Sequence, residues 1–243
     1  MNNTFSITYN VLATTVDKNN NMRFDCILNT FQDIATFHSD EMGVSYEKLL
    51  NSSNAIWVLS KIKFVTYKTP LWNEKTTFST YPTDISSFRF IREFTITGDM
   101  GAKVYGHSEW CVLDATTGGL RKSNSIKYPF DLERRTDNLP IPPFERLNYE
   151  VDDTNYVYTY NVSLTDIDCN NHTNNVAYAR MALNSFDLDE YFNCNFKGLE
   201  IKFLNQTYIG NSIKIFKKII EENKVYVVGY KDNNIVFSAL FTK

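Results

Sequence analysis

Side chains that could do chemistry are concentrated between residues 165 and 175, in the stretch TDIDCNNHTNN. It holds two aspartates, four asparagines and one of the three histidines of the 243-residue chain. Side chains alternate along an extended stretch, so every second residue faces the same side. On that pattern one face carries Asp166, Asp168, Asn170 and His172. A carboxylate or an imidazole there can activate water for hydrolysis of an acyl group.

A helical pattern follows this stretch at once, and its first backbone N–H groups are unpaired and attract negative charge. We expect these N–H groups to stabilise an oxyanion. The competing interpretation is a plain polar turn, because Asp and Asn are also common helix caps and turn formers. We expect that role for Asn171, Asn174 and Asn175. Cys169 alternates away from the polar face, and we expect it to pack.

The chain contains an internal repeat. ITYNVLATTVDKNNNMRF from Ile7 and YTYNVSLTDIDCNNHTNN from Tyr158 align at a constant offset. A second pair, IKFVTYKTPLWNEKTTF from Ile62 and IKFLNQTYIGNSIKIF, aligns with one residue of slippage. Asn21 stands where His172 stands in the second copy. The repeat therefore predicts that one copy carries the chemistry and the other copy only the shape.

Both copies show the same order of elements: a strand, a polar turn, a helix and then several strands. Apolar residues recur at helical spacing after each turn. They are Phe24, Ile27, Leu28, Phe31, Ile34 and Ala35 in the first copy, and Val176, Ala179, Ala182, Leu183 and Phe186 in the second. The strands that follow are β-branched and alternating, with turn residues at TGDMGA, DATTGG and YKDNNI, which indicates antiparallel hairpins.

A long antiparallel sheet wrapped around one apolar helix is the hotdog arrangement. We therefore predict an α+β double hotdog: residues 1–130 form an N-terminal hotdog without a catalytic histidine, and residues 155–243 form a C-terminal catalytic one. Residues 131–154 contain three of the six prolines and few apolar side chains, so we expect a linker there.

Composition excludes several classes of protein. The net charge of -3 argues against a nucleic-acid binder, which normally carries a strong positive excess. The N-terminal residues have no secretory-signal pattern, and the apolar runs are too short to span a bilayer. The four cysteines have no CxxC or disulfide spacing, so we expect reduced thiols and a cytoplasmic protein.

Other residues and motifs are weaker candidates for a catalytic or ligand-binding site. His38 lies late in the first predicted helix and His107 precedes a predicted strand, so we expect structural or solvated roles for both. The sequence shows no zinc-ligand spacing, P-loop, GxGxxG or GxSxG motif.

The sequence resembles the acyl-acyl carrier protein (acyl-ACP) thioesterase family of plant plastids and many bacteria. DIDCNNHTNNVAYARMAL resembles the family motif D-x-D-x-N-x-H-x-N-N-x-x-Y. IWVLSKIKF, PLWNEKTTFSTYPT, FRFIREFTI and SEWCVLDATTGGLRK resemble the family's N-terminal sheet, in order and spacing. LEIKFLNQTYIGNSI resembles the stretch after the second helix. The resemblance covers nearly the whole chain.

This resemblance implies a double hotdog that hydrolyses fatty acyl-ACP and releases free fatty acid, without a cofactor or metal. It assigns catalysis to Asp168, Asn170 and His172, and most of the acyl-chain pocket to the N-terminal half. An acyl-CoA thioesterase of the same fold, or a non-catalytic acyl-chain-binding protein, are the alternatives. The sequence also leaves open whether the chain forms a homodimer.

The sequence departs from the family at one place. Family members carry a glutamate, followed by cysteine in the plant enzymes, shortly after the LE strand. Here Leu204, Asn205 and Gln206 occupy that neighbourhood, so no acid or thiol is available. We expect Asn205 or Gln206 to take over the glutamate's role, with Asn174 and Asn175 as further supporting residues.

An acidic carrier protein would need a cationic patch on this acidic chain. The segments GLRKSNSIKYP and LERR supply the concentration of positive charge that lies outside the regular strands. The docking residues that we predict are Arg121, Lys122, Lys127, Arg134 and Arg135. The competing interpretation is a solvated surface, which small basic clusters usually are.

Overall fold

The computed structural model describes residues 3–131, 135 and 139–243. The chain divides into two compact units, residues 1–142 and 143–243. The domain boundaries that we predict from the sequence, with hotdogs at residues 1–130 and 155–243 and a linker between them, stay a prediction. Among the described residues, no helix combines the length and the apolar character needed to cross a membrane.

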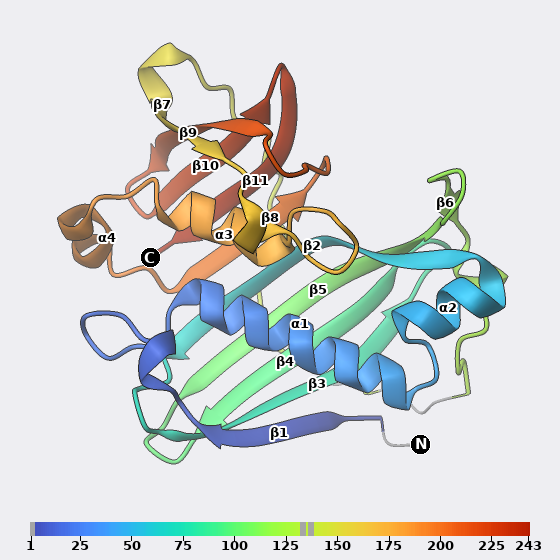
Figure 1. The fold of residues 1–243 in the computed structure, drawn as a ribbon. Coiled ribbons are helices and arrows are strands. Elements are labelled where there is room, and N and C mark those ends of the chain that lie inside the picture. The colour runs from blue at the N-terminus through green and yellow to red at the C-terminus, as the bar shows by residue number, and fades with distance from the viewer. Residues whose placement is uncertain (1–2, 132–134, 136–138) are drawn as a thin grey trace. The chain divides into compact units, whose positions relative to one another are not determined.

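Unit 1 is an antiparallel sheet with one long helix across it (Figure 1). Its main elements are β1 (Phe5–Asn10), η1 (Ala13–Thr15), α1 (Phe24–Glu41), α2 (Tyr46–Ser53), β2 (Ala55–Lys68), β3 (Lys75–Ile85), β4 (Phe90–Gly98), β5 (Lys103–Asp114), β6 (Leu120–Arg121) and η2 (Ser123–Ser125). The strand order is β1-β3-β4-β5-β2, and β6 pairs with β5. The hairpin turns predicted at TGDMGA and DATTGG are confirmed, with Gly101 and Gly118 at positive φ.

Aromatic side chains fill the space between α1 and the sheet of unit 1. Phe31 stacks on Phe94 with ring centroids 4.4 Å apart, and Phe24 meets Phe64 edge-on at 4.9 Å. Gly106 makes room for Phe31, because a Cβ there would lie 2.4 Å from Phe31 Cε2. The apolar stripe of α1 that the sequence predicts is therefore the face buried against the sheet.

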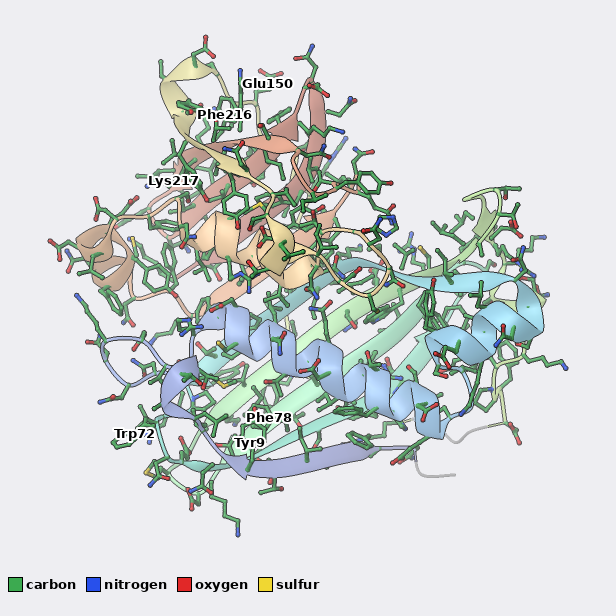
Figure 2. All side chains as sticks on the ribbon, viewed as in Figure 1. Tyr9, Trp72, Phe78, Glu150, Phe216 and Lys217 are labelled. Atoms are coloured by element: carbon green, nitrogen blue, oxygen red, sulfur yellow. The ribbon has the colours of Figure 1, made fainter. Side chains whose placement is uncertain are left out.

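The stacked pair Tyr9 and Phe78, labelled in Figure 2, joins the first strand to this core from the sheet edge. Their ring centroids lie 4.8 Å apart with the planes at 10°. Tyr9 Oη also lies 3.2 Å from Thr30 Oγ1 on α1. Strand β1, helix α1 and strand β3 are thus tied together around the entry to the first polar turn.

Unit 2 repeats the arrangement of unit 1. Its elements are η3 (Asp153–Asn155), β7 (Tyr156–Asn161), η4 (Leu164–Asp166), α3 (Asn175–Leu183), α4 (Leu188–Cys194), β8 (Gly198–Phe203), β9 (Ser212–Glu221), β10 (Lys224–Lys231) and β11 (Asn234–Thr242). The strand order β7-β9-β10-β11-β8 corresponds strand by strand to that of unit 1. The predicted repeat and the α+β double-hotdog fold are confirmed.

The central helix of unit 2 is shorter than the sequence predicts. Helix α3 ends at Leu183, so Phe186 lies beyond it instead of continuing the helix. Phe186 packs against Phe241 with ring centroids 4.9 Å apart. A second helix, α4, then begins, and the Asp187 side chain caps it by accepting a hydrogen bond from Glu190 N at 2.8 Å. The helical spacing of Phe186 in the sequence therefore reflects its packing against Phe241 and not a continuation of the helix.

Part of the segment predicted as a linker belongs to unit 2. Leu147 is buried, and it packs with Tyr226, Val228 and Leu240 in one apolar cluster. The Glu145 amide donates to both carboxylate oxygens of Glu200, at 3.0 and 3.1 Å. This stretch therefore covers an apolar face of the second sheet instead of crossing open solvent.

Candidate active site

The stretch from Asp168 to His172 is a tight turn, so the prediction of an extended stretch with one polar face is wrong. Asp168 N donates to His172 O at 2.9 Å, and Asn171 N donates to Asp168 O at 3.0 Å. Asn171 has φ 62°, a left-handed conformation that asparagine tolerates better than most residues. Local hydrogen bonding has replaced the alternation expected of a strand.

The Asp168 carboxylate holds this turn together. Its Oδ1 accepts hydrogen bonds from Asn170 N at 2.8 Å and from His172 N at 3.3 Å. Among the described residues, no hydrogen bond joins the Asp168, Asn170 and His172 side chains to one another. Asp168 and His172 are half-buried, and Asn170 is exposed. The turn thus gathers the three predicted catalytic residues into one backbone loop, and the two turn amides bind Oδ1 of the Asp168 carboxylate.

The turn in unit 1 has the same backbone geometry. Asp17 Oδ1 accepts from Asn19 N at 2.8 Å and from Asn21 N at 3.0 Å, and Asp17 N donates to Asn21 O at 2.8 Å. Asn20 has φ 62°, like Asn171. The aspartate is therefore needed by the turn itself in both copies. Two residues of the turn differ between the copies: Lys18 is replaced by Cys169, and Asn21, at the end of the turn, is replaced by His172.

Cys169 is exposed, so the expectation that it packs is wrong. It occupies a central position of the turn, where side chains point away from the fold instead of alternating as in a strand. The four cysteines are free, as the sequence predicts.

Asp166 is separated from the turn, contrary to the prediction that it shares a face with Asp168. It lies in η4 and is 2% exposed. Its Oδ2 accepts from Tyr160 Oη at 2.8 Å and from Ser163 N and Oγ at 2.9 and 3.0 Å, and its Oδ1 accepts from Arg180 Nη2 at 3.3 Å. Burial alone would raise the pKa of Asp166, but these hydrogen bonds and the Arg180 charge outweigh it and hold the pKa below its usual value.

Helix α3 begins directly after the turn and is capped by Asn174. The Asn174 Oδ1 accepts from Val176 N at 2.8 Å, so one of the helix N–H groups is already satisfied. Asn174 N donates to Asp166 O at 2.7 Å, and this bond ties the helix start to η4. Asn175 is the first helical residue.

The loop 204–211 lies beside the turn. Thr173 N donates to Thr207 O at 2.9 Å, and the His172 and Tyr208 rings meet at 63° with centroids 5.2 Å apart. Thr207 is fully buried and Tyr208 is exposed. The sequence reasoning missed these contacts, since residues so far apart in the chain show no shared pattern.

Asn205 and Gln206 have different surroundings, and the support of the site that we predict for them stays a prediction. The Asn205 Nδ2 donates to Ile235 O at 2.6 Å, and Asn205 N donates to Val236 O at 3.1 Å, so this residue binds the β11 segment. Gln206 is exposed. Within the described part of the chain, neither side chain hydrogen-bonds to the 168–172 turn.

The predicted docking residues have different environments. Arg121 donates to Ser53 O and to Ser125 O, so it ties together parts of unit 1. Lys122 and Lys127 are exposed. The Arg135 guanidinium lies 4.3 Å from the centroid of the Tyr81 ring. Arg134 lies outside the described residues.

The two remaining histidines belong to unit 1. His38 is fully buried on α1, with Nδ1 2.9 Å from Arg92 Nη1. Burial lowers the pKa of Arg92 to about 10. His107 lies within β5 instead of preceding the strand, with Nδ1 3.5 Å from Glu93 Oε1. Both histidines therefore contact charged side chains within the sheet of unit 1, Arg92 for His38 and Glu93 for His107.

The turn in the second of the two hotdog units presents a carboxylate and an imidazole beside a helix start, an arrangement that could activate water for hydrolysis of an acyl group. Comparison with sequence families agrees. The acyl-ACP thioesterase N-terminal domain matches residues 2–126, and the C-terminal domain of the same family matches residues 149–236. The chain therefore belongs to the acyl-ACP thioesterase family and is a thioester hydrolase acting on acyl chains.

Solved structures share the fold over nearly the whole chain. An acyl-ACP thioesterase from Bacteroides thetaiotaomicron is 21% identical, with a TM-score of 0.90 over 99% of this chain and 97% of that one. The 12:0-ACP thioesterase from Umbellularia californica is 12% identical, with a TM-score of 0.83 over 100% and 97%. At these identities the likeness shows the fold. No curated protein matches the chain.

Proposed function

We propose that the chain hydrolyses the thioester of fatty acyl-ACP, releases free fatty acid and so terminates fatty acid synthesis. The observation that carries this proposal is the pair of turns with one backbone geometry, of which only the second ends in a histidine. Membership of the family and the names of the two similar structures support acyl-ACP as the substrate. A cytoplasmic location stays a prediction.

Asp168 acts in this proposal as the general base or the nucleophile. Its Oδ1 is occupied by the turn amides, so Oδ2 is the oxygen that faces the reaction. Asn170 positions the water or the carbonyl. As the acyl carbon–sulfur bond breaks, His172 polarises the thioester or assists transfer of the proton to the leaving thiolate. Removal of the Asp168 or the His172 side chain should therefore lower kcat more than it changes KM.

The acyl chain is proposed to lie mainly in the N-terminal half. Support comes from the interior of unit 1, where aromatic rings from α1 and the sheet form an apolar layer. An apolar interior favours a hydrocarbon chain, since burial of each CH₂ group is favourable by about 0.8 kcal/mol, but the rings that now fill this interior would have to move apart to admit the chain. Exposed cations of the same unit, Lys122 and Lys127, are proposed to dock the carrier protein together with the predicted arginines Arg121, Arg134 and Arg135.

The experiment that tests this function is a product profile on acyl-ACPs of varied chain length, with acyl-CoAs run in parallel. We expect release of free fatty acid from acyl-ACP with the higher kcat/KM. Equal or faster turnover of acyl-CoA would favour the acyl-CoA thioesterase, and tight acyl binding without turnover would favour the non-catalytic binder.

The docking part of the proposal has its own test. Reversal of Arg134 and Arg135 to Glu, and separately of Lys122 and Lys127 to Glu, should raise KM for acyl-ACP and flatten its salt dependence. Hydrolysis of an acyl thioester that lacks carrier protein should hardly change. An equal effect on both substrates, or on neither, would remove these residues from the docking surface.

A further inference from the structure

Three buried positions beside the polar turn differ in chemistry between the two copies. In each copy, the residue after the turn donates its amide to a carbonyl on the facing loop: Met22 N to Pro70 O at 2.8 Å, and Thr173 N to Thr207 O at 2.9 Å. These bonds and the common helix start define equivalent positions. The pairs are Met22 and Thr173, Ile27 and Tyr178, and Pro70 and Thr207. Unit 1 has an apolar side chain at all three, and unit 2 has a hydroxyl at all three.

The three hydroxyls of unit 2 form one hydrogen-bonded cluster, which we call the hydroxyl lock (Thr173, Tyr178 and Thr207). Thr207 Oγ1 lies 2.7 Å from Thr173 Oγ1 and 2.9 Å from Tyr178 Oη. Thr173 Oγ1 donates to Thr207 O at 3.0 Å, and Thr207 N donates to Tyr178 Oη at 3.1 Å. If Tyr178 donates to Thr207 Oγ1, and Thr207 Oγ1 in turn donates to Thr173, every hydroxyl proton of the lock has an acceptor.

The lock is buried and electrically neutral. Thr173, Tyr178 and Thr207 are 5%, 3% and 0% exposed. Burial raises the pKa of Tyr178, its hydrogen bonds with Thr207 and Thr173 oppose this rise, and the nearby Asp168 carboxylate adds to it. Tyr178 therefore stays protonated at neutral pH and remains a donor. The influence of Asp168 also places the lock within electrostatic reach of the turn.

The fold does not require these hydroxyls. Met22 and Ile27 are 1% and 0% exposed in unit 1, where apolar packing supports the same turn and the same bond between turn and loop. Each buried hydroxyl must be hydrogen-bonded to avoid a desolvation cost of about 1–3 kcal/mol, whereas an apolar side chain avoids that requirement. A directional cluster in place of apolar packing fixes one geometry, which is what a catalytic side chain needs.

The lock adjoins the imidazole on both sides. Thr173 directly follows His172, and Thr207 directly precedes Tyr208, whose ring meets the His172 ring at 5.2 Å. We propose that the hydroxyl lock and Tyr208 position the His172 imidazole for thioester hydrolysis, with Thr207 as the central positioning residue. This inference rests on the proposed catalytic role of His172. The lock residues act through the histidine and need not touch the substrate.

The test compares Thr207→Val, which removes the hydroxyl and keeps the shape, with Thr207→Ser, which keeps the hydroxyl. We expect Thr207→Val to lower kcat by roughly tenfold or more with KM little changed, because small misplacements of a catalytic group are costly. Thr207→Ser should retain most of the wild-type kcat. Tyr178→Phe should behave like Thr207→Val. Its matched control is Tyr158→Phe, which removes a tyrosine hydroxyl that donates to Met181 O at 2.8 Å on the same helix.

Two further measurements separate positioning from loss of fold. In a His172→Ala background, Thr207→Val should cause no additional loss, because its effect passes through the histidine. In NMR spectra, Thr207→Val and Tyr178→Phe should shift or broaden the His172 ring signals, which are identifiable because the chain has three histidines. Tyr158→Phe should leave those signals in place.

The outcomes distinguish this inference from the proposed function. Wild-type kcat and unchanged His172 signals in Thr207→Val would overturn the positioning role. An equal loss in Thr207→Ser, or an additive loss in the His172→Ala background, would overturn it as well, since packing would then explain the effect. If the wild-type protein is inactive but its His172 signals still respond to Thr207→Val, the thioesterase proposal is refuted. The inference that the hydroxyl lock positions the His172 imidazole then still stands.

Discussion

Substitution of the two equivalent aspartates by asparagine separates the structural from the chemical role of the carboxylate. Asp17 and Asp168 each accept two turn amides through Oδ1, at 2.8 and 3.0 Å in the first copy and at 2.8 and 3.3 Å in the second. Both side chains belong to half-buried residues. Asp17→Asn therefore measures what the turn alone loses, and Asp168→Asn measures that loss together with any chemistry.

The structural loss follows from the hydrogen bonds. Asparagine keeps an acceptor oxygen but not the charge, and a bond to a charged group contributes about 1.5–3 kcal/mol against about 0.5–1.5 kcal/mol for a neutral one. Two bonds on a half-buried residue, one of them long in Asp168, therefore give a loss of unfolding free energy of about 1–2 kcal/mol in each variant. The chemical loss is separate: removal of a general base lowers kcat by about 10²–10⁴-fold.

The assay is steady-state hydrolysis of acyl-ACP with both variants, alongside urea unfolding. We expect similar destabilisation in the two, near-normal kcat in Asp17→Asn, and almost complete loss of kcat in Asp168→Asn with acyl binding retained. Comparable kcat in the two folded variants would refute the assignment of the base to Asp168. A much larger destabilisation by Asp168→Asn would show that the two turns are not equivalent.

Three further experiments test the assignment of the site to unit 2, the packing of unit 1 and the role of Asp166. His172→Ala should lower kcat by roughly a hundredfold or more while Asn21→Ala leaves it nearly intact, and equal losses would contradict a single site in unit 2. Gly106→Ala should destabilise unit 1 by about 1–3 kcal/mol in urea unfolding, because its Cβ would overlap the Phe31 ring. Asp166 has a lowered folded pKa, so its contribution to stability is present above about pH 4 and is lost as pH falls through the folded value. The stability difference between wild type and Asp166→Asn should therefore narrow in acid, and a constant difference from pH 6 to pH 3 would contradict this assignment.

The sequence was sufficient to predict the repeat and the fold because both depend on local patterns. The apolar spacing of α1, the hairpin turns and the matching motifs are all visible within short windows. Helix α3 was predicted too long for the same reason. Phe186 continues the apolar spacing, yet it is a half-buried residue of the loop that precedes α4, where it packs against Phe241. Apolar periodicity indicates which residues pack inward, and an apolar loop residue that packs inward can imitate a helical one.

The site was predicted in part. The sequence identifies the turn and the exchange of Asn21 for His172, but the alternation rule fails where an asparagine adopts the left-handed conformation. Comparison of the two copies at constant offset would have revealed two of the lock residues, since Thr173 and Tyr178 align with the apolar residues Met22 and Ile27. The third, Thr207, lies on a loop where the alignment of the copies slips, and its partners are fixed only by the folded chain.

The two copies together indicate that a histidine alone is not enough for a site. Asn21→His would place an imidazole on a turn that already has the aspartate and the correct backbone. Its neighbours would be Met22 and Leu71 in place of Thr173 and Tyr208, so neither a hydroxyl lock nor an aromatic ring would hold it. In a His172→Ala background, we therefore expect Asn21→His to restore no measurable hydrolysis of acyl-ACP. Recovery of turnover would show that the turn by itself orients the imidazole, and that the hydroxyls of unit 2 serve only its stability.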